Sequence, residues 1–201
     1  ETCMTNILLI LAHPNFTQSQ INSKLINSVK HLPNVKVNDL YQTYPDGIIN
    51  IEAEQKKLEQ ADVIVFQHPF YWYSAPALLK EWIDLVLQFN YAYGPKGTRL
   101  QNKKWLSVVT TGSAESTYQQ HGTNKFTIRQ LMVPFEQTAR LCNMIFIPPI
   151  VAYCARTLTT DESKLNSITT LYLNTLDKLS EPNADIGALL KLETMNQAIQ
   201  G

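Results

Sequence analysis

Short apolar segments of strand length recur along the chain and alternate with segments that have the apolar spacing of a helix. The strand-like segments are residues 6–12, 35–41, 62–67, 104–110 and 144–153. The helix-like segments are residues 21–32, 50–61, 76–89 and 165–179, with a further helix that ends near residue 142. Because a parallel strand needs a long crossover to reach its neighbour, this alternation indicates a parallel sheet covered by helices on both faces. The sequence therefore predicts an α/β protein.

The number of strands narrows the topology further. Five parallel strands of this kind most often take the flavodoxin-like order 2-1-3-4-5 with right-handed crossovers, which gives a three-layer sandwich. We expect residues 4–180 to form this domain and residues 181–201 to form a C-terminal appendage that is not a separate domain. Ligands of such sheets bind outside the carboxyl ends of the strands, where the strand order reverses. The loops after the first, third and fourth strands are therefore expected to hold a binding site.

Composition excludes several classes of protein. The 201 residues are 44% hydrophobic and 17% charged with a formal net charge of zero, which is typical of a globular domain and gives no electrostatic footprint for nucleic acid. The apolar runs are too short to span a bilayer, and the first residues lack the pattern of a secretory signal. The three cysteines are widely spaced, which predicts reduced thiols in a cytoplasmic protein. The four histidines have no metal-ligand spacing, so we expect no metal site.

The first of the three loops, residues 12–22 (AHPNFTQSQIN), carries polar groups before and within the first turn of a helix. It contains no glycine, so the G-x-G-x-x-G dinucleotide fingerprint and the Walker A loop are both absent. His13, Thr17, Ser19 and Asn22 add polar side chains to the free N–H groups of the helix start, which is an arrangement that binds anions such as a terminal phosphate. The alternative is that Ser19 only caps the helix and His13 only closes the turn.

The second loop places four aromatic residues in a row, Phe70, Tyr71, Trp72 and Tyr73. Turns normally favour Gly, Asn, Asp and Ser, because these residues tolerate turn dihedrals and face water. At the carboxyl end of a central strand, aromatic rings can stack on a flat heteroaromatic cofactor whose polar edge bonds to the main chain. The alternative is packing in the core or at a subunit interface, which is a common fate of clustered aromatics.

The third loop, residues 110–122 (TTGSAESTYQQHG), combines small residues with hydroxyl groups, so its backbone can approach a ligand closely. Tyr118 and His121 follow and are near enough in the sequence to cooperate in proton transfer. The alternative is a solvated loop with a structural glycine. A phosphate site, an aromatic wall and a polar backbone edge that meet at one crevice together describe a site for flavin mononucleotide (FMN).

Six segments of the chain match a known family in order and spacing. They are residues 9–22, 39–46, 53–84, 89–94, 110–116 and 134–144. In these segments the chain resembles the flavodoxin-like NAD(P)H:quinone oxidoreductase family, and within it the ancillary flavoproteins of glutathione-regulated potassium efflux systems. The stretch HPFYWYSAPALLKEWID is the most specific part of the match. The resemblance implies a homodimer with two active sites at the subunit interface, each holding a non-covalent flavin.

The resemblance also implies roles for individual residues. Together with the three loops, it gives an expected cofactor site formed by His13, Thr17, Ser19, Gln20, Ile21, Asn22, Pro69, Phe70, Tyr71, Trp72, Tyr73, Thr110, Thr111, Gly112, Ser113 and Tyr118. Tyr91 and Tyr93 match aromatic residues that line the substrate pocket across the dimer. Tyr118 matches a tyrosine that helps a histidine stabilise the reduced flavin in animal quinone reductases. Asn124 stands in the place of that histidine, and the nearby His121 is the candidate substitute.

These observations lead to one functional hypothesis and two alternatives. The first is a two-electron NAD(P)H:quinone oxidoreductase, in which hydride passes from NAD(P)H through FMN to a quinone or similar acceptor, and the choice of FMN over FAD rests on the resemblance. The second is a regulatory subunit that activates a glutathione-gated potassium efflux transporter, so that a cytoplasmic protein meets the inner membrane only through this partner. The third is a one-electron carrier, against which the zero net charge argues because acidic surfaces suit docking to redox partners.

Overall fold

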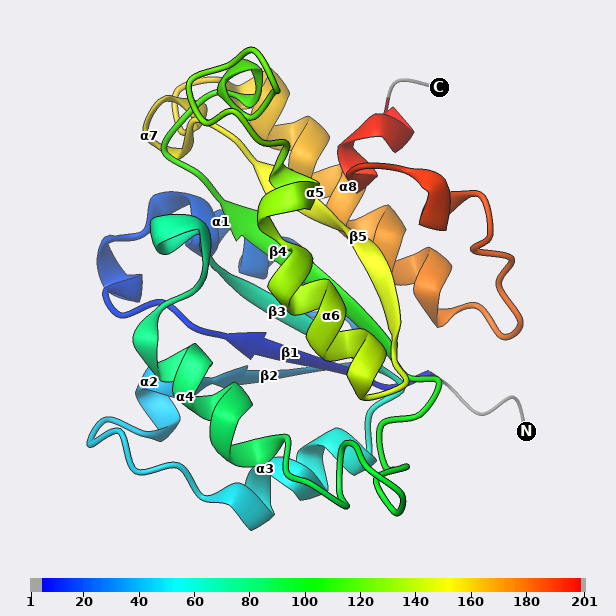
Figure 1. The fold of residues 1–201 in the computed structure, drawn as a ribbon. Helices are drawn as coiled ribbons and strands as arrows, with labels where there is room; N and C mark the ends of the chain where they lie inside the picture. Colours follow the sequence, from blue (N-terminus) through cyan, green and yellow to red (C-terminus); the bar gives the residue numbers. More distant parts are fainter. Residues whose placement is uncertain (1–4, 200–201) are drawn as a thin grey trace.

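The computed structural model describes residues 5–199, which form a five-stranded parallel sheet with helices on both faces (Figure 1). The strands are β1 (Ile7–Leu11), β2 (Val35–Asp39), β3 (Val63–Pro69), β4 (Lys104–Thr110) and β5 (Ile145–Ala152). Their order in the sheet is β2-β1-β3-β4-β5, and every pairing is parallel. The predicted flavodoxin-like topology is confirmed.

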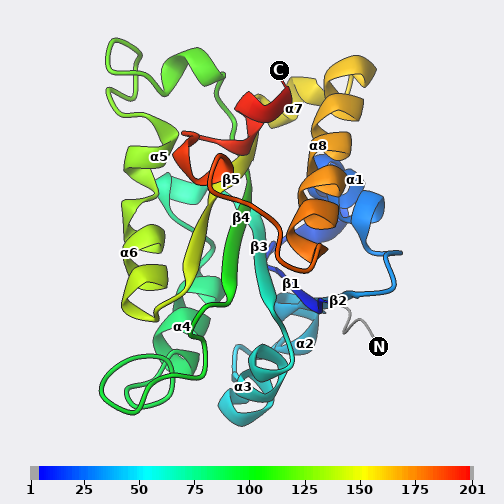
Figure 2. The ribbon, with the colours of Figure 1, turned by 90° about the vertical axis from the view of Figure 1, so that its right-hand side faces the viewer.

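The α-helices form the two outer layers. They are α1 (Gln20–Val29), α2 (Leu40–Thr43), α3 (Ile51–Glu59), α4 (Ala77–Val86), α5 (Ile128–Leu131), α6 (Val133–Leu141), α7 (Ala155–Leu158) and α8 (Glu162–Ser180). Strand side chains alternate between two cores: Leu9 of β1 packs with α1 and α8, whereas Leu8 and Ile10 pack with α3, α4 and α6 (Figure 2). Every residue of β1 and β3 is buried, because both strands are central and covered on both sides.

One helix ends earlier than its apolar spacing predicts. α4 stops at Val86, and the chain turns at Asn90, which has a φ of 63°. Phe89, the last residue of the helix that the apolar spacing predicts, therefore lies outside the helix and is 60% exposed, so the predicted end of this helix is wrong. Trp82 of the same helix is fully buried. The helical spacing of apolar residues extends three residues beyond the point where the helix ends.

A buried carboxylate connects β2, α3 and α4. Glu54 is fully buried and accepts hydrogen bonds from Trp82 Nε1 (2.8 Å), Asn38 Nδ2 (2.7 Å), Tyr44 Oη (2.7 Å) and Lys57 Nζ (2.5 Å). Burying a charge is costly unless hydrogen bonds and an opposite charge compensate it, and here both do. The network fixes α4, and with it the aromatic turn that leads into α4.

The segment after α8 is docked on the edge of the sheet. It contains the 3-10 helices η4 (Leu189–Lys191) and η5 (Met195–Ile199), which lie beside β5 and α8 (Figure 2). The Asn196 side chain accepts a hydrogen bond from the Val151 N–H (2.9 Å) and donates one to the Val151 carbonyl (2.8 Å). Met195 is buried against the core under α8. This segment therefore covers backbone groups of β5 that no neighbouring strand pairs.

Candidate functional site

The three loops that the sequence singles out meet at the carboxyl ends of β1, β3 and β4, around a cavity of about 540 Å³. Its lining residues are His13, Gln18, Ser19, Gln20, Ile21, Asn22, Pro69, Phe70, Tyr71, Thr110, Thr111, Gly112, Ala155, Arg156 and Thr159. Five residues expected at the cofactor lie outside this lining, namely Thr17, Trp72, Tyr73, Ser113 and Tyr118. The volume is typical of a small-molecule site.

The start of α1 supplies unpaired donors to this cavity. Ser19 stands at the N-cap position, but its hydroxyl accepts no hydrogen bond from a backbone N–H group of the first turn. Within residues 5–199, the backbone N–H groups of Gln20, Ile21 and Asn22 have no hydrogen-bond acceptor. A helix start with free N–H groups attracts anions, because the donors and the helix dipole act in the same direction.

A chain of buried amides holds this helix start in place. The Asn22 side chain donates to Ser19 Oγ (3.1 Å) and to Thr110 Oγ1 (3.2 Å), which connects α1 to β4. Gln67 of β3 donates to the Asn22 carbonyl (3.0 Å), and Tyr172 of α8 donates to Gln67 Oε1 (3.3 Å). Asn22, Gln67, Thr110 and Tyr172 are all buried. The donors at the start of α1 are therefore fixed relative to three other elements before a ligand arrives.

His13 presents a neutral imidazole beside the aromatic turn. Its Nδ1 accepts a hydrogen bond from the Asn15 N–H (3.1 Å), and its ring meets that of Tyr71 edge-on at 6.4 Å. Burial lowers the pKa of His13 below its ordinary value, and the carboxylate of Asp39 offsets part of this effect. Since Nδ1 is an acceptor, the neutral ring carries its proton on Nε2. His13 can therefore donate a hydrogen bond to a ligand at neutral pH.

The aromatic turn divides between packing and exposure. Phe70 is buried, whereas Tyr71, Trp72 and Tyr73 are 44%, 91% and 46% exposed. Trp72 and Tyr73 have φ values of 48° and 62°, in the left-handed region that non-glycine residues rarely adopt. The Tyr73 hydroxyl donates to Asn124 Oδ1 (3.0 Å). Core packing thus explains only Phe70, and Tyr71 is the ring of this turn, besides Phe70, that lines the cavity.

The third loop offers open backbone at the cavity. A Cβ built on Gly112 would meet no atom within 4 Å, so the space beside this residue is available to a ligand. The Thr111 hydroxyl donates to the Ser113 carbonyl (2.9 Å), which stabilises the turn. Ser113 itself faces solvent.

The two residues expected to move protons occupy different environments. Tyr118 is buried, with its ring 5.9 Å from that of Tyr153, and burial raises the pKa of its hydroxyl. His121 is exposed, and no hydrogen bond joins it to Tyr118 within residues 5–199. Tyr118 therefore keeps its proton at neutral pH, while His121 is open to solvent.

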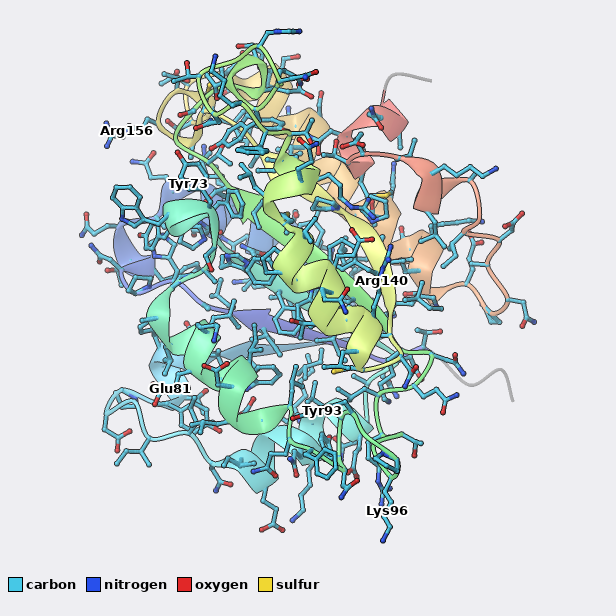
Figure 3. The ribbon with its side chains drawn as sticks, viewed as in Figure 1. Tyr73, Glu81, Tyr93, Lys96, Arg140 and Arg156 are labelled. Carbon is cyan, nitrogen blue, oxygen red and sulfur yellow. The ribbon has the colours of Figure 1, made fainter. Side chains whose placement is uncertain are left out.

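Tyr91 and Tyr93 lie far from the cavity of their own chain. They belong to the loop between α4 and β4, at the amino ends of the strands. Tyr91 Oη donates to the Gln55 carbonyl (3.0 Å), and the Tyr93 ring packs against Phe89 at 5.7 Å. Figure 3 shows Tyr93 at the opposite end of the molecule from Arg156. Contact with a substrate in the cavity would therefore require a second copy of the chain.

The structure adds four residues to the cavity that the sequence did not indicate, Gln18, Ala155, Arg156 and Thr159. The last three belong to or follow α7, directly after β5. The segment CARTLTT has no aromatic or glycine cluster, and β5 is an edge strand that lies away from the reversal of strand order between β1 and β3. Only the topology could have predicted these residues, because the carboxyl end of β5 lies at the same edge of the sheet as those of β3 and β4.

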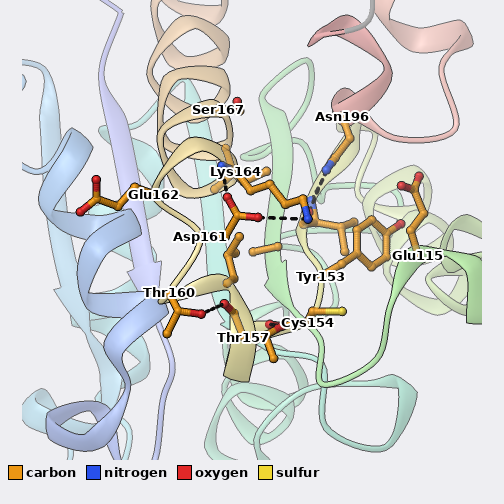
Figure 4. A pocket seen from close by; sticks show the side chains of 14 residues that line it. Glu115, Tyr153, Cys154, Thr157, Thr160, Asp161, Glu162, Lys164, Ser167 and Asn196 are labelled. Carbon is orange, nitrogen blue, oxygen red and sulfur yellow. Dashed lines mark hydrogen bonds and ion pairs between the residues drawn. The ribbon is translucent and has the colours of Figure 1, made fainter.

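A larger cavity of about 990 Å³ lies on the other side of α7 (Figure 4). Its lining includes Tyr153 and Cys154 from the end of β5 and Asn196 from the docked tail. Asp161 and Lys164 also line it and form an ion pair at 3.1 Å. No residue that the sequence assigns to the cofactor lines this cavity in the described chain. The 540 Å³ cavity is therefore the candidate site.

Within residues 5–199, no helix is long and apolar enough to cross a membrane. In the same range, no group of three or more His, Cys, Asp or Glu side chains is placed to hold a metal ion.

The fold and the site define an α/β protein with a ligand cavity at the point where the strand order of its parallel sheet reverses. Residues 5–173 match the family model described as "Flavodoxin-like fold", and the chain belongs to this family. Among curated proteins, the chain is similar to the glutathione-regulated potassium-efflux system ancillary protein KefG of Erwinia tasmaniensis. The identity is 47% over 150 residues, which are 75% of this chain and 82% of that protein.

Solved structures give a second comparison. The general stress protein 14 of Treponema denticola, in complex with FMN, has 36% identity and a TM-score of 0.81, over 87% of this chain and 99% of that one. An NADPH-quinone reductase of P. pentosaceus has 32% identity and a TM-score of 0.78, over 85% of this chain and 97% of that one. The resemblance to the quinone oxidoreductase family and to the potassium-efflux ancillary proteins is thus confirmed.

Proposed function

We propose that this chain is an FMN-dependent oxidoreductase that transfers two electrons from NAD(P)H to a quinone or a similar small acceptor. The observation that carries the proposal is the cavity at the carboxyl ends of β1, β3 and β4, formed by one polar, one aromatic and one small-residue loop. Relatives at 36% and 32% identity that are described as an FMN complex and as an NADPH-quinone reductase support it.

The residues of the cavity fit FMN. The free N–H groups at the start of α1 and the Ser19 hydroxyl suit a phosphate. The half-exposed ring of Tyr71 provides an apolar wall, and the backbone at Gly112 provides open polar groups for a heteroaromatic edge. When bound, the flavin supplies the redox chemistry, while the protein supplies binding, orientation and electrostatics. His13 would donate its Nε2 proton to an oxygen of the ligand.

Tyr118 is the proposed source of a proton during turnover. Its raised pKa keeps the hydroxyl protonated at neutral pH, so it can donate where negative charge develops. His121 is exposed on the same loop and would return the proton from solvent. In this proposal Tyr118 acts in the chemical step, and His121 acts only through it.

We propose a homodimer for the active form, with substrate bound between the two copies. The exposed rings of Trp72 and Tyr73 support this, because large apolar side chains beside a cavity mark interaction surfaces. Tyr91 and Tyr93 support it as well, since they could line a substrate pocket only in a partner copy.

A second candidate function is favoured by the curated relatives, which are ancillary proteins of potassium-efflux systems. In that role a cytoplasmic flavoprotein would bind the transporter and activate it, and redox turnover would be secondary. Both roles can belong to one protein. Co-purification with an efflux transporter from the source cells, compared between flavin-loaded and flavin-free protein, tests this candidate.

The central test is spectroscopic. The purified protein is expected to bind FMN, to lose its visible absorption when NADH or NADPH is added without oxygen, and to regain it with menadione. Bound flavin that neither nicotinamide reduces would refute the oxidoreductase and leave the ancillary role. A failure to bind flavin after incubation with FMN or FAD would refute the assignment of the cavity.

A further inference from the structure

Arg156 is the one charged side chain around the 540 Å³ cavity among the described residues. It lies on α7, whose start is fixed to the third loop. The Cys154 N–H donates to the Ser113 carbonyl (3.1 Å), and the Ala155 N–H donates to the Thr111 carbonyl (2.8 Å). Within residues 5–199, no carboxylate forms an ion pair with the Arg156 guanidinium. The cavity therefore has a cation on a fixed backbone that the protein itself does not neutralise.

The topology brings this cation to the same end of the molecule as the start of α1. α1 and α8 pack against each other on one face of the sheet, and both helices begin at the carboxyl ends of the strands. α7 leads directly into α8, so Arg156 and the free N–H groups of α1 line one cavity. Gln18 and Thr159 add neutral polar groups to the same lining. Donors, a helix dipole and a guanidinium at one place suit a phosphate, which arginine can bind with two parallel hydrogen bonds.

We propose that Arg156 binds the terminal phosphate of the flavin nucleotide and thereby makes the site selective for FMN over FAD. The inference rests on the proposed flavin site and names the residue that sets its cofactor specificity. A phosphate monoester carries roughly 1.5 to 2 negative charges near neutral pH. The corresponding phosphate of FAD is joined to a second phosphate by an anhydride bond and carries one negative charge. Because the Coulomb energy scales with the product of the charges, a fixed cation and a helix dipole favour the monoester.

The experiment compares three ligands and three variants. FMN, FAD and riboflavin are titrated into flavin-free protein, and binding is followed by the quenching of flavin fluorescence. Arg156→Gln removes the charge and Arg156→Lys keeps it without the planar fork. Arg140→Gln makes the same change on α6, at a side chain outside the cavity (Figure 3). Thermal melts of all variants check that each is folded.

We expect Arg156→Gln to weaken FMN binding about tenfold, which is the lower end for a charge-assisted hydrogen bond because Arg156 is exposed. FAD should lose less affinity than FMN, and riboflavin should be unchanged within about twofold, because the interaction scales with phosphate charge. The FMN affinity of Arg156→Lys should lie between those of the unaltered protein and Arg156→Gln. Arg140→Gln should bind all three ligands like the unaltered protein. Added salt should weaken FMN binding more in the unaltered protein than in Arg156→Gln.

Two results would overturn the proposal. If Arg156→Gln loses equal affinity for FMN and riboflavin, Arg156 shapes the pocket and does not recognise phosphate. An unchanged FMN affinity with a selective loss of reduction by NADPH, but not by NADH, would mean that Arg156 recognises the phosphate of the nicotinamide nucleotide. If the unaltered protein binds none of the three flavins, the proposed function itself fails. That outcome is distinct from the other two.

Discussion

His68 is expected to make the stability of this protein fall steeply in mild acid. The residue lies near the end of β3, fully buried, with its ring 5.8 Å from that of Phe135. Its Nδ1 lies 2.9 Å from the Pro69 carbonyl, and its Nε2 has no hydrogen-bond partner within residues 5–199. Burial lowers the pKa of His68 from 6.5 to about 4. The folded protein therefore holds this imidazole neutral under conditions in which the unfolded chain would protonate it.

The direction of the effect follows from proton linkage. Between pH 6.5 and about 4 the unfolded chain binds a proton at His68 and the folded chain does not, so the free energy of unfolding falls as the pH falls. The difference between the two pKa values corresponds to about 3 kcal/mol in full, of which about 2 kcal/mol is lost by pH 5. Above pH 6.5 this residue contributes no pH dependence.

The assay is urea unfolding of the unaltered protein and of His68→Gln at pH 7 and pH 5. The variant is expected to be less stable at pH 7, because it loses a well-packed ring. The gap should shrink by about 2 kcal/mol at pH 5, because only the unaltered protein pays the cost of proton exclusion there. His31→Gln changes an exposed histidine and should follow the unaltered protein at both pH values. Parallel stability curves for the unaltered protein and His68→Gln would refute the argument.

Four other substitutions separate folding from function. Glu54→Gln should lower the free energy of unfolding in urea by about 3 kcal/mol, because it leaves the partly buried Lys57 without the buried carboxylate that pairs with it. Gly112→Ala should leave the melting temperature unchanged and weaken FMN binding in a fluorescence titration, since its Cβ meets open space. Gly122→Ala should instead lower the melting temperature, because its Cβ would come within 2.5 Å of a backbone oxygen. Tyr118→Phe should retain flavin but slow its reduction by NAD(P)H in stopped-flow absorption, and unchanged kinetics would exclude the proposed proton donor.

The sheet could be predicted from the sequence because each strand is marked by what buries it. β1, β3 and β4 are covered on both faces, so their apolar runs are continuous and bounded by polar residues. The order of the strands followed from their number and from the handedness of crossovers. The end of α4 could not be predicted in the same way. The apolar spacing includes Phe89, but the turn at Asn90 is a backbone property that side-chain spacing does not encode.

The candidate site was predictable as far as its loops follow central strands. His13, Phe70 and Gly112 each lie just beyond one of the three central strands β1, β3 and β4, and the structure places all three at one cavity. Arg156 escaped prediction because it follows the edge strand β5, and its approach depends on α7, a helix of a single turn. The contact of Asn196 with β5 could not be predicted for a similar reason. A single side-chain amide that pairs with the backbone of an edge strand leaves no periodic signal in the sequence.

The aromatic turn shows that the two interpretations left open by the sequence apply to different residues. Phe70 is packed in the core, and Tyr71 lines the cavity beside His13. Within one chain, Trp72 and Tyr73 neither pack in the core nor line the cavity. They hold left-handed backbone conformations that cost roughly 1 to 2 kcal/mol each, and Trp72 is almost fully exposed. In the proposed homodimer the second copy would cover the exposed Trp72 ring. The turn would then be the place where cofactor binding and assembly of two copies depend on each other.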